Sequence, residues 1–158
     1  MVRRFLHLPL FALLAISLVF ATPGLSSQEQ ITNKGVKKRV ALMLTSQAAI
    51  ATLSDMMAGR VAFQADKARA ARRSLIRTNS SIARRFKKSH QDPLSNARPE
   101  IWTYWSDFKI QADLAEDAAR QLNANNIGGL RRTLPNMLQS CLSCHDSYRT
   151  EPNEFITH

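Results

Sequence analysis

The sequence predicts an all-α protein, an antiparallel up-down-up-down bundle of four helices. Alternating runs of Val, Ile, Thr and Tyr are missing, only 5 glycines occur, and Ala, Leu, Arg and Gln are abundant. Apolar residues recur every three or four positions in four segments, which is the spacing of one helix face. Two short turns and one longer loop join these segments, so neighbouring helices are expected to run antiparallel around a shared core.

The first helix is expected over about residues 32–58, and Gly59 provides its stop. Its apolar face consists of Val36, Val40, Met43, Ile50 and Met57. The second helix is expected from about residue 63 towards Ser89, with Ala68, Leu75, Ile82 and Phe86 along one face. The polar triplet at residues 79–81 weakens its middle, so a kink is expected there, and residues 90–98 form the longer loop.

The third helix is expected to begin at Pro99, because proline suits the first helical turn. Its apolar face consists of Ile101, Trp105, Phe108, Ala112, Ala115, Ala119 and Leu122. The fourth helix places Leu130, Leu134, Met137, Cys141, Cys144 and Tyr148 on one face, so both cysteines are expected to point at the core. Pro135 leaves two alternatives: it marks the true start of this helix, with Thr133 as the cap, or it kinks a longer helix that begins near Ile127.

The first residues have the pattern of a secretory signal peptide. Arg3 and Arg4 form a charged start, residues 5–21 are largely apolar, and no acidic residue occurs in the first 28 positions. The apolar run contains His7 and Pro9 and is shorter than the roughly 20 residues that span a bilayer, which disfavours a retained membrane anchor.

The chain of 158 residues is therefore expected to contain one exported domain. Residues 1–27 are the predicted signal peptide, cleaved somewhere between positions 21 and 27, and residues 28–158 are the predicted four-helix bundle. This organisation predicts a periplasmic protein that is not an integral membrane protein.

The mature protein is strongly basic. The chain has 22 Lys and Arg against 12 Asp and Glu, a net charge of +10, and loss of Arg3 and Arg4 with the signal leaves +8. Nine basic residues lie between Lys67 and Lys88 with no acidic residue among them. Export and the lack of interleaved aromatic residues argue against a nucleic-acid partner. The run is either a solvated helix face or a surface that steers an acidic redox partner protein or touches anionic lipid.

The two cysteines of the chain both belong to the pentapeptide Cys-Leu-Ser-Cys-His at residues 141–145. Residues three and four apart share a helix face, so Cys141, Cys144 and His145 converge on one patch. Two thiols at this spacing can add to the vinyl groups of a haem while the adjacent imidazole binds iron. The sequence therefore predicts one covalently bound haem c, attached to Cys141 and Cys144, with His145 as the proximal iron ligand.

Three other uses of the cysteine pair stay open. A structural zinc site needs further ligands, and the other mature histidines are His90 in a loop and His158 at the terminus. A thioredoxin-like dithiol needs a βαβ setting, and a disulfide between neighbouring turns closes too small a loop to stabilise much. No paired carboxylates, Ser-His-Asp arrangement or phosphate-binding loop is visible, so the protein is not expected to be an enzyme.

Three stretches of the sequence resemble the class II cytochromes c, the cytochrome c' family, in which a four-helix bundle carries haem c near its C-terminus. They are residues 141–149, residues 97–108 with their Ile-Trp pair, and Arg39-Val-Ala-Leu-Met43 followed by Gly59 sixteen residues later. Together they cover most of residues 38–149. The chain departs from the family at Ala62-Phe63, where Pro-Tyr is common, in its basic second helix, and at Pro135, where a small residue is usual.

The resemblance places Met43 at the distal position, whose residue decides what the haem does in this family. A methionine that binds iron gives a six-coordinate, low-spin electron carrier, whereas a residue that does not bind leaves five-coordinate iron open to nitric oxide and other small gases. We take Met43 as the distal ligand, so the main hypothesis is a periplasmic electron carrier. The alternative is a gas-binding haem protein in which Met43 is an ordinary core methionine.

Further haem-pocket residues follow from the same resemblance. It places Arg39 and Arg149 near the haem edge, where each either holds a propionate or extends its charge to solvent. It also makes Phe108 a core residue that packs on the haem. Family members pair through their first two helices, so a homodimer is one expected assembly, although here these helices carry heavy like charge.

Overall fold

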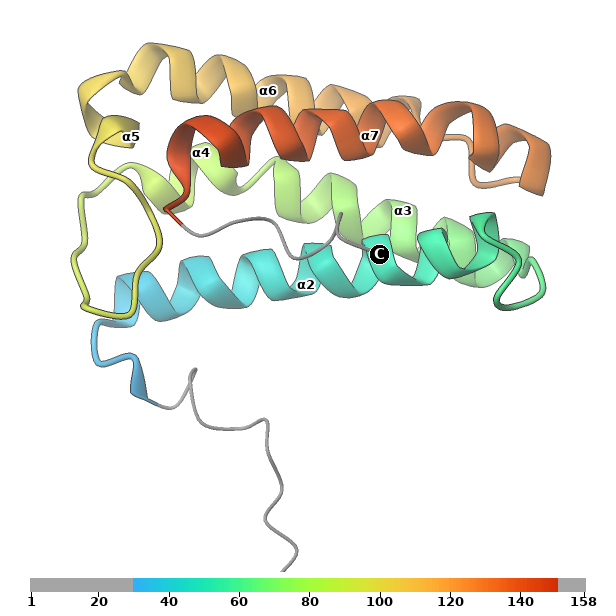
Figure 1. The fold of residues 1–158 in the computed structure, drawn as a ribbon, viewed down its shortest axis with the longest axis horizontal. Coiled ribbons are helices and arrows are strands. Elements are labelled where there is room, and N and C mark those ends of the chain that lie inside the picture. Colours follow the sequence, from blue (N-terminus) through green and yellow to red (C-terminus); the bar gives the residue numbers. More distant parts are fainter. Residues whose placement is uncertain (1–29, 151–158) are drawn as a thin grey trace, which may run out of the picture.

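The computed structural model describes residues 30–150, and these residues form the predicted all-α four-helix bundle (Figure 1). The elements are α2 (Lys34–Met57), α3 (Ala65–Asn79), α4 (Ile82–Phe86), α5 (Glu100–Thr103), α6 (Trp105–Gln121) and α7 (Ile127–Tyr148). Helix α2 packs on α3, α3 on α6, α6 on α7, and α7 on α2, which closes the bundle. Within the described residues the only β pairing is an isolated bridge between Ala97 and Arg149.

The first helix has the expected bounds because both of its ends are defined by local chemistry. The Asn33 side chain caps α2 by accepting from the backbone N–H groups of Gly35 at 2.8 Å and Val36 at 3.2 Å. Past its C-terminus, Gly59 adopts a φ of 75°, the left-handed conformation that lets the chain turn towards α3. The predicted signal peptide lies outside the described residues.

The second predicted helix is two helices, and the break falls at the polar triplet. Asn79 is buried at the end of α3, where its amide donates to the carbonyl of Ala115 on α6 at 3.1 Å. Helix α4 then begins at Ile82, directly after Ser81, and ends at Phe86. The expectation that this helix continues towards Ser89 is therefore wrong.

The third helix is also interrupted, which its sequence pattern does not predict. Helix α5 follows Pro99 directly and ends at Thr103, and Tyr104 leaves the helical region with φ −109° and ψ 46° before α6 begins. Trp102 on α5 explains the position of this short helix, because its indole N–H donates to the carbonyl of Phe86 at 2.7 Å. That hydrogen bond ties α5 to the end of α4.

The fourth helix begins at Ile127 and contains Pro135, so the alternative that it starts at Pro135 with Thr133 as cap is wrong. Asn126 caps it by accepting from the N–H of Gly129 at 2.7 Å. Thr133 has a different role: its hydroxyl accepts from the backbone N–H of Asn123 at 2.9 Å and so holds the preceding loop. Pro135 is exposed, where the lost helical hydrogen bond leaves a carbonyl open to water.

The core of the bundle is divided into two clusters along its length. The larger, which we call the main core, contains Leu53, Leu75, Leu130, Leu134 and Met137 among its fully buried residues. The smaller, the aromatic core, consists of Ile82, Phe86, Ile101, Phe108, Ala112 and Tyr148. Both cores draw on α7, so this helix runs past the junction between them.

Helix α2 has an unusually apolar outward face. It is long and apolar enough to cross a membrane by length and composition, yet only 22% of its most apolar window is buried in the bundle. One such helix is weak evidence for a membrane span. Ala41, Leu44, Ala48 and Ala51 are exposed and follow one another at helical spacing, with Leu44 44% exposed.

Candidate haem site

The haem motif lies on α7 at the junction of the two cores. Cys141 packs against the main core, whereas Cys144, almost one turn later, packs against the aromatic core. His145 is half-buried on the following position. The prediction that both cysteines face the interior is confirmed, and the motif lies at the level where one core gives way to the other.

The inner faces of α2 and α7 are only half-buried at this level. Helix α2 has no buried residue between Arg39 and Ala49, and α7 has none between Met137 and Tyr148. The partly buried side chains there include Leu42, Met43, Leu138, Cys141 and Cys144. Two thiols, an imidazole and a largely apolar surface are what a covalently bound, flat, apolar macrocycle requires, so the residues present fit haem c.

The two cysteines are not joined to each other by a disulfide. Burial raises the pKa of Cys141, and burial together with the charges of Cys141 and Asp107 raises the pKa of Cys144 to about 12. The alternative disulfide is not formed. Within residues 30–150 no three His, Cys, Asp or Glu side chains lie close enough to hold a metal ion, so the described residues offer no zinc site.

Met43 lies on α2 and packs against the aromatic core together with Leu42 and Cys144. The structure thus brings Met43, Phe108 and Cys144 to one cluster, although they come from three different helices. This packing does not test whether the Met43 thioether binds iron, so iron ligation by Met43 stays a prediction.

Phe108 is the centre of the aromatic core and is 2% exposed. Its ring centroid lies 5.3 Å from Phe86, 5.6 Å from Trp105 and 5.2 Å from Tyr148. Contacts of this geometry add to the free energy gained by burial alone. Phe108 therefore forms a rigid side of the candidate site. Its burial agrees with its predicted position on the apolar face of the third helix.

Tyr148 and Asp107 form a hydrogen bond at this wall. The Tyr148 hydroxyl donates to the Asp107 carboxylate at 2.6 Å and links the end of α7 to the first turn of α6. Burial and this hydrogen bond raise the pKa of Tyr148 to about 12. The neutral phenol is thus the form that the fold prefers.

We expect the Tyr148–Asp107 pair to make the free energy of unfolding fall at alkaline pH. The pKa of tyrosine is about 10 in the unfolded chain, and the pKa of the folded Tyr148 is about 12. The stabilising contribution of Tyr148 is therefore fully present below about pH 10 and is lost as the pH rises to about 12. Urea unfolding midpoints measured across this range should fall less steeply for Tyr148→Phe than for wild type. The matched control is Tyr104→Phe, whose tyrosine is 60% exposed. Parallel curves for wild type and Tyr148→Phe would contradict this role.

Arg39 is buried, with 3% of its surface exposed, so the alternative that it extends its charge to solvent is wrong. Its guanidinium donates to the carbonyls of Arg85 at 3.3 Å and His90 at 3.1 Å, and also to that of Lys88. It lies 4.9 Å from the ring centroid of Phe86 and 5.0 Å from that of Trp102. Arg39 therefore holds the chain that leaves α4, and a bond to a haem propionate stays a prediction.

Arg149 follows α7 and is half-buried. Its backbone N–H donates to the carbonyl of His145 at 2.9 Å, and the bridge to Ala97 joins it to the segment before α5. Arg98 reinforces this junction by donating to the carbonyls of Asp146 and Ser147. The loop thus fastens the end of the helix that carries the haem motif, and the predicted haem contact of Arg149 stays a prediction.

Three contributors to the site are missing from the sequence-based set. Trp102, Asp107 and Tyr148 each make a hydrogen bond that shapes it. The helical spacing places Tyr148 on the inner face of α7. Its partner could not be found, because Asp107 is 41 residues away and becomes a neighbour only when α6 packs on α7.

The comparisons with known proteins agree with this geometry. The family model described as cytochrome C' matches residues 34–149. Cytochrome c' from Rubrivivax gelatinosus has a similar structure, with a TM-score of 0.65 at 19% identity over 76% of this chain and 98% of that one. Cytochrome c prime from Shewanella frigidimarina reaches 0.68 at 19% identity over 74% and 94%.

A variant of cytochrome c prime from Alcaligenes xylosoxidans, solved as a nitric oxide complex, has a TM-score of 0.67 at 23% identity, with 74% of this chain and 94% of that chain covered. No protein of curated function is similar enough in sequence to match. The solved structures support the fold, and the family model covers most of the chain. The chain belongs to the cytochrome c' family, whose members carry one covalently bound haem c.

Proposed function

We propose that this protein binds nitric oxide or a similar small gas at a five-coordinate haem iron. The proposal reverses the order of the two hypotheses drawn from the sequence, which put electron transfer first. Family membership supports it, together with the relatives from Alcaligenes xylosoxidans that were solved with nitric oxide or carbon monoxide bound.

Family membership is the observation that carries the proposal, and the apolar packing of Met43 is compatible with it. The Met43 side chain lies against the aromatic core beside Leu42, as a methionine filling space in a core does. The cluster against which it packs is largely aliphatic and aromatic, with Ile82, Phe86 and Phe108 among its members. Such surroundings favour a neutral diatomic gas over water or a charged ligand. Water and charged ligands would lose hydrogen bonds to solvent that apolar side chains cannot replace.

The chain's own residues divide the remaining work. Cys141 and Cys144 would hold the haem through thioether bonds, and His145 would be the proximal iron ligand, because all three lie on one face of α7. Phe108 gives the site a rigid wall, and the Tyr148–Asp107 hydrogen bond keeps α6 and α7 in register. When bound, the haem would supply an iron atom able to bind a small gas.

Electron transfer through a Met43-ligated haem is the second candidate. It is supported by the fact that Met43 and Cys144 contact the same cluster, which keeps the thioether near the attachment site. A thioether ligand would raise the reduction potential. The basic residues of α3 and α4 would then face an acidic redox partner protein.

Carbon monoxide titration of the reduced protein separates the two candidates. We expect wild type to bind the gas tightly, and Met43→Leu to change the affinity by less than about threefold, under 1 kcal/mol. Met57→Leu is the matched control, because Met57 is half-buried on the same helix but packs against the main core. Weak binding by wild type that Met43→Leu strengthens by tenfold or more would favour the electron carrier.

We also propose that the mature protein works in the periplasm as a homodimer joined through α2. The exposed stripe of Ala41, Leu44, Ala48 and Ala51 supports this, because small residues let two copies of one helix approach closely in an isologous contact. Light scattering of wild type and Leu44→Lys tests it, with Leu114→Lys on α6 as the control, since Leu114 is likewise exposed, at 53%. A monomeric wild type would contradict the dimer.

A further inference from the structure

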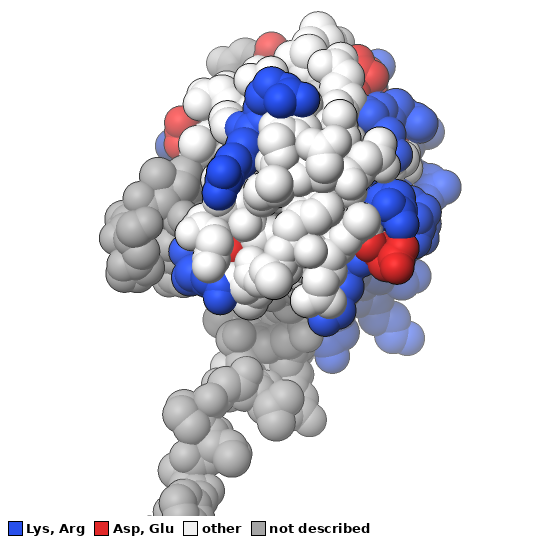
Figure 2. Space-filling view, turned by 90° about the vertical axis from the view of Figure 1, so that its right-hand side faces the viewer, with Lys and Arg blue, Asp and Glu red and all other residues white. Residues whose placement is uncertain are grey.

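A basic pocket lies at the end of the bundle remote from the aromatic core. Figure 2 looks onto this end, where Lys and Arg side chains surround a largely uncharged centre and acidic side chains are few. The pocket has a volume of about 380 Å³ and lies between α3 and the loop that follows α6. Its lining residues are Arg69, Arg72, Arg73, Gln121, Leu122, Asn123, Ala124 and Asn125, so three cations and no anion line it.

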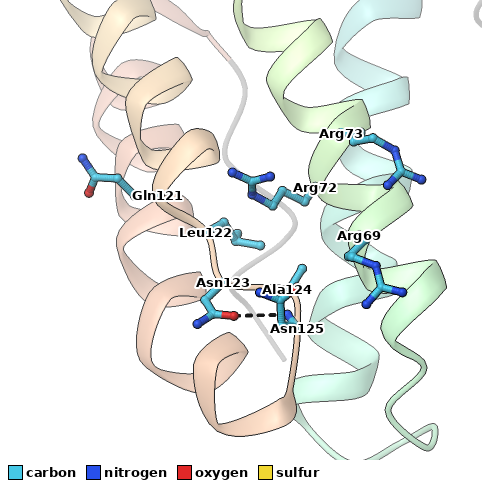
Figure 3. A pocket seen from close by; sticks show the side chains of 8 residues that line it. All are labelled: Arg69, Arg72, Arg73, Gln121, Leu122, Asn123, Ala124 and Asn125. Carbon is cyan, nitrogen blue, oxygen red and sulfur yellow. Dashed lines mark hydrogen bonds between the residues drawn. The ribbon is translucent and has the colours of Figure 1, made fainter.

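Arg72 is the central residue of this pocket. Figure 3 shows its side chain reaching from α3 towards the loop, whereas the guanidinium groups of Arg69 and Arg73 extend from the opposite side of α3. The Arg72 Nη2 donates to the carbonyl of Arg120 at 2.5 Å, which fixes the guanidinium in place. Its Nε is covered by protein and has no hydrogen-bond partner among residues 30–150. A buried donor without an acceptor costs free energy, and this cost would fall if the Arg72 guanidinium turned to meet an anion in the pocket.

The other groups at the pocket also suit an anion. Arg73 is exposed and forms no ion pair with any residue between positions 30 and 150, whereas Arg69 pairs with the exposed Asp66. The Asn123 side-chain oxygen accepts from the backbone N–H of Asn125 at 3.1 Å, and Figure 3 shows its NH₂ group on the side away from Arg72. The guanidinium groups are therefore the donors that match the oxygens of a phosphate group.

We propose that this pocket binds a phosphate-bearing anion, with Arg72 and Arg73 as its principal ligands. The volume equals that of about a dozen water molecules at roughly 30 Å³ each, which suits a diphosphate or a phosphate ester better than a monatomic ion such as chloride. The half-apolar wall formed by Leu122 and Ala124 fits the organic part of an ester. The phosphate belongs either to a soluble compound or to a lipid headgroup. This site is separate from the gas-binding proposal and does not depend on it.

Calorimetric titration of the haem-loaded full chain with inorganic pyrophosphate, at constant ionic strength, tests the proposal. We expect Arg72→Gln and Arg73→Gln each to raise the Kd for pyrophosphate at least tenfold. Arg77→Gln is the matched control, because it removes the same charge from the same helix outside the pocket and should change the Kd by less than twofold. Arg73 is exposed, so its variant keeps the test valid even if the Arg72 variant folds poorly.

Vesicles distinguish the two sources of phosphate. Co-sedimentation with phosphatidylcholine vesicles, with and without phosphatidic acid, should weaken in the Arg72 and Arg73 variants alone if the phosphate is a lipid headgroup. Equal sedimentation of all variants, with pyrophosphate binding lost only in those two, indicates a soluble compound. The proposal is overturned if wild type does not bind pyrophosphate, or if Arg77→Gln weakens binding as much as the pocket variants.

Discussion

Replacing Cys141 and Cys144 together with serine should abolish covalent haem attachment. Serine hydroxyls do not form the thioether bonds that hold haem c, and residues 141 and 144 are the only cysteines in the chain. Protein purified from cells competent in haem c assembly should lose all pigment on extraction with acidified acetone, whereas wild type stays red. The inner faces of α2 and α7 are only half-buried at this level, so the colourless variant should also unfold at a lower temperature.

The control for this experiment is Ser143→Ala, within the same pentapeptide. Ser143 is exposed on α7, so its replacement should leave both loading and melting temperature near those of wild type. Single replacements of Cys141 or Cys144 should give protein with haem bound through one remaining bond. Full loading of the double variant would refute the assignment of the two cysteines.

Arg39→Gln should lower the free energy of unfolding by about 3 kcal/mol. The guanidinium serves three backbone carbonyls at once, those of Arg85, Lys88 and His90, and a glutamine can serve at most two. The variant also loses the contacts of this cation with two aromatic rings. Urea unfolding of the haem-loaded protein, monitored by far-ultraviolet circular dichroism, measures the change.

Lys38→Gln is the matched control, because Lys38 is the exposed neighbour of Arg39 on α2. It removes one positive charge without touching the carbonyls and should cost less than about 0.5 kcal/mol. Equal stabilities of the two variants would mean that Arg39 is not what holds the segment after α4.

The sequence predicts the bundle because its signals are local. Helix caps, glycine stops and the three-four spacing of apolar residues depend on neighbours in the chain, and they place α2 and the inner face of α7 correctly. The same locality explains why Cys141 and Cys144 could be placed facing inward. Their spacing on one helix determines it.

What the sequence could not predict depends on contacts across the bundle. Arg39 looks like a surface cation until the loop after α4 brings three carbonyls to it. The break at Tyr104 depends on the hydrogen bond from Trp102 to Phe86, which lies 16 residues earlier. Pro135 is tolerated inside α7 because the packing of the whole helix outweighs one lost hydrogen bond.

The basic residues between Lys67 and Lys88 are also distributed differently in the structure than their sequence suggests. In the sequence they form one uninterrupted run, which suggests one charged face. In the structure Arg72 reaches towards the α6–α7 loop and lines a pocket with Arg69 and Arg73, while Arg84 and Arg85 belong to the separate helix α4. The number of charges in the sequence could not predict which of these residues line the pocket and which lie on α4.

The electron paramagnetic resonance spectrum of the purified ferric protein tests the central claim most directly, because it reports the coordination of iron without any variant. A five-coordinate haem held by Cys141, Cys144 and His145 should give a high-spin signal, with no far-red absorption from a bond between methionine sulfur and ferric iron. A low-spin signal accompanied by that absorption would contradict the gas-binding account and make Met43 the sixth ligand.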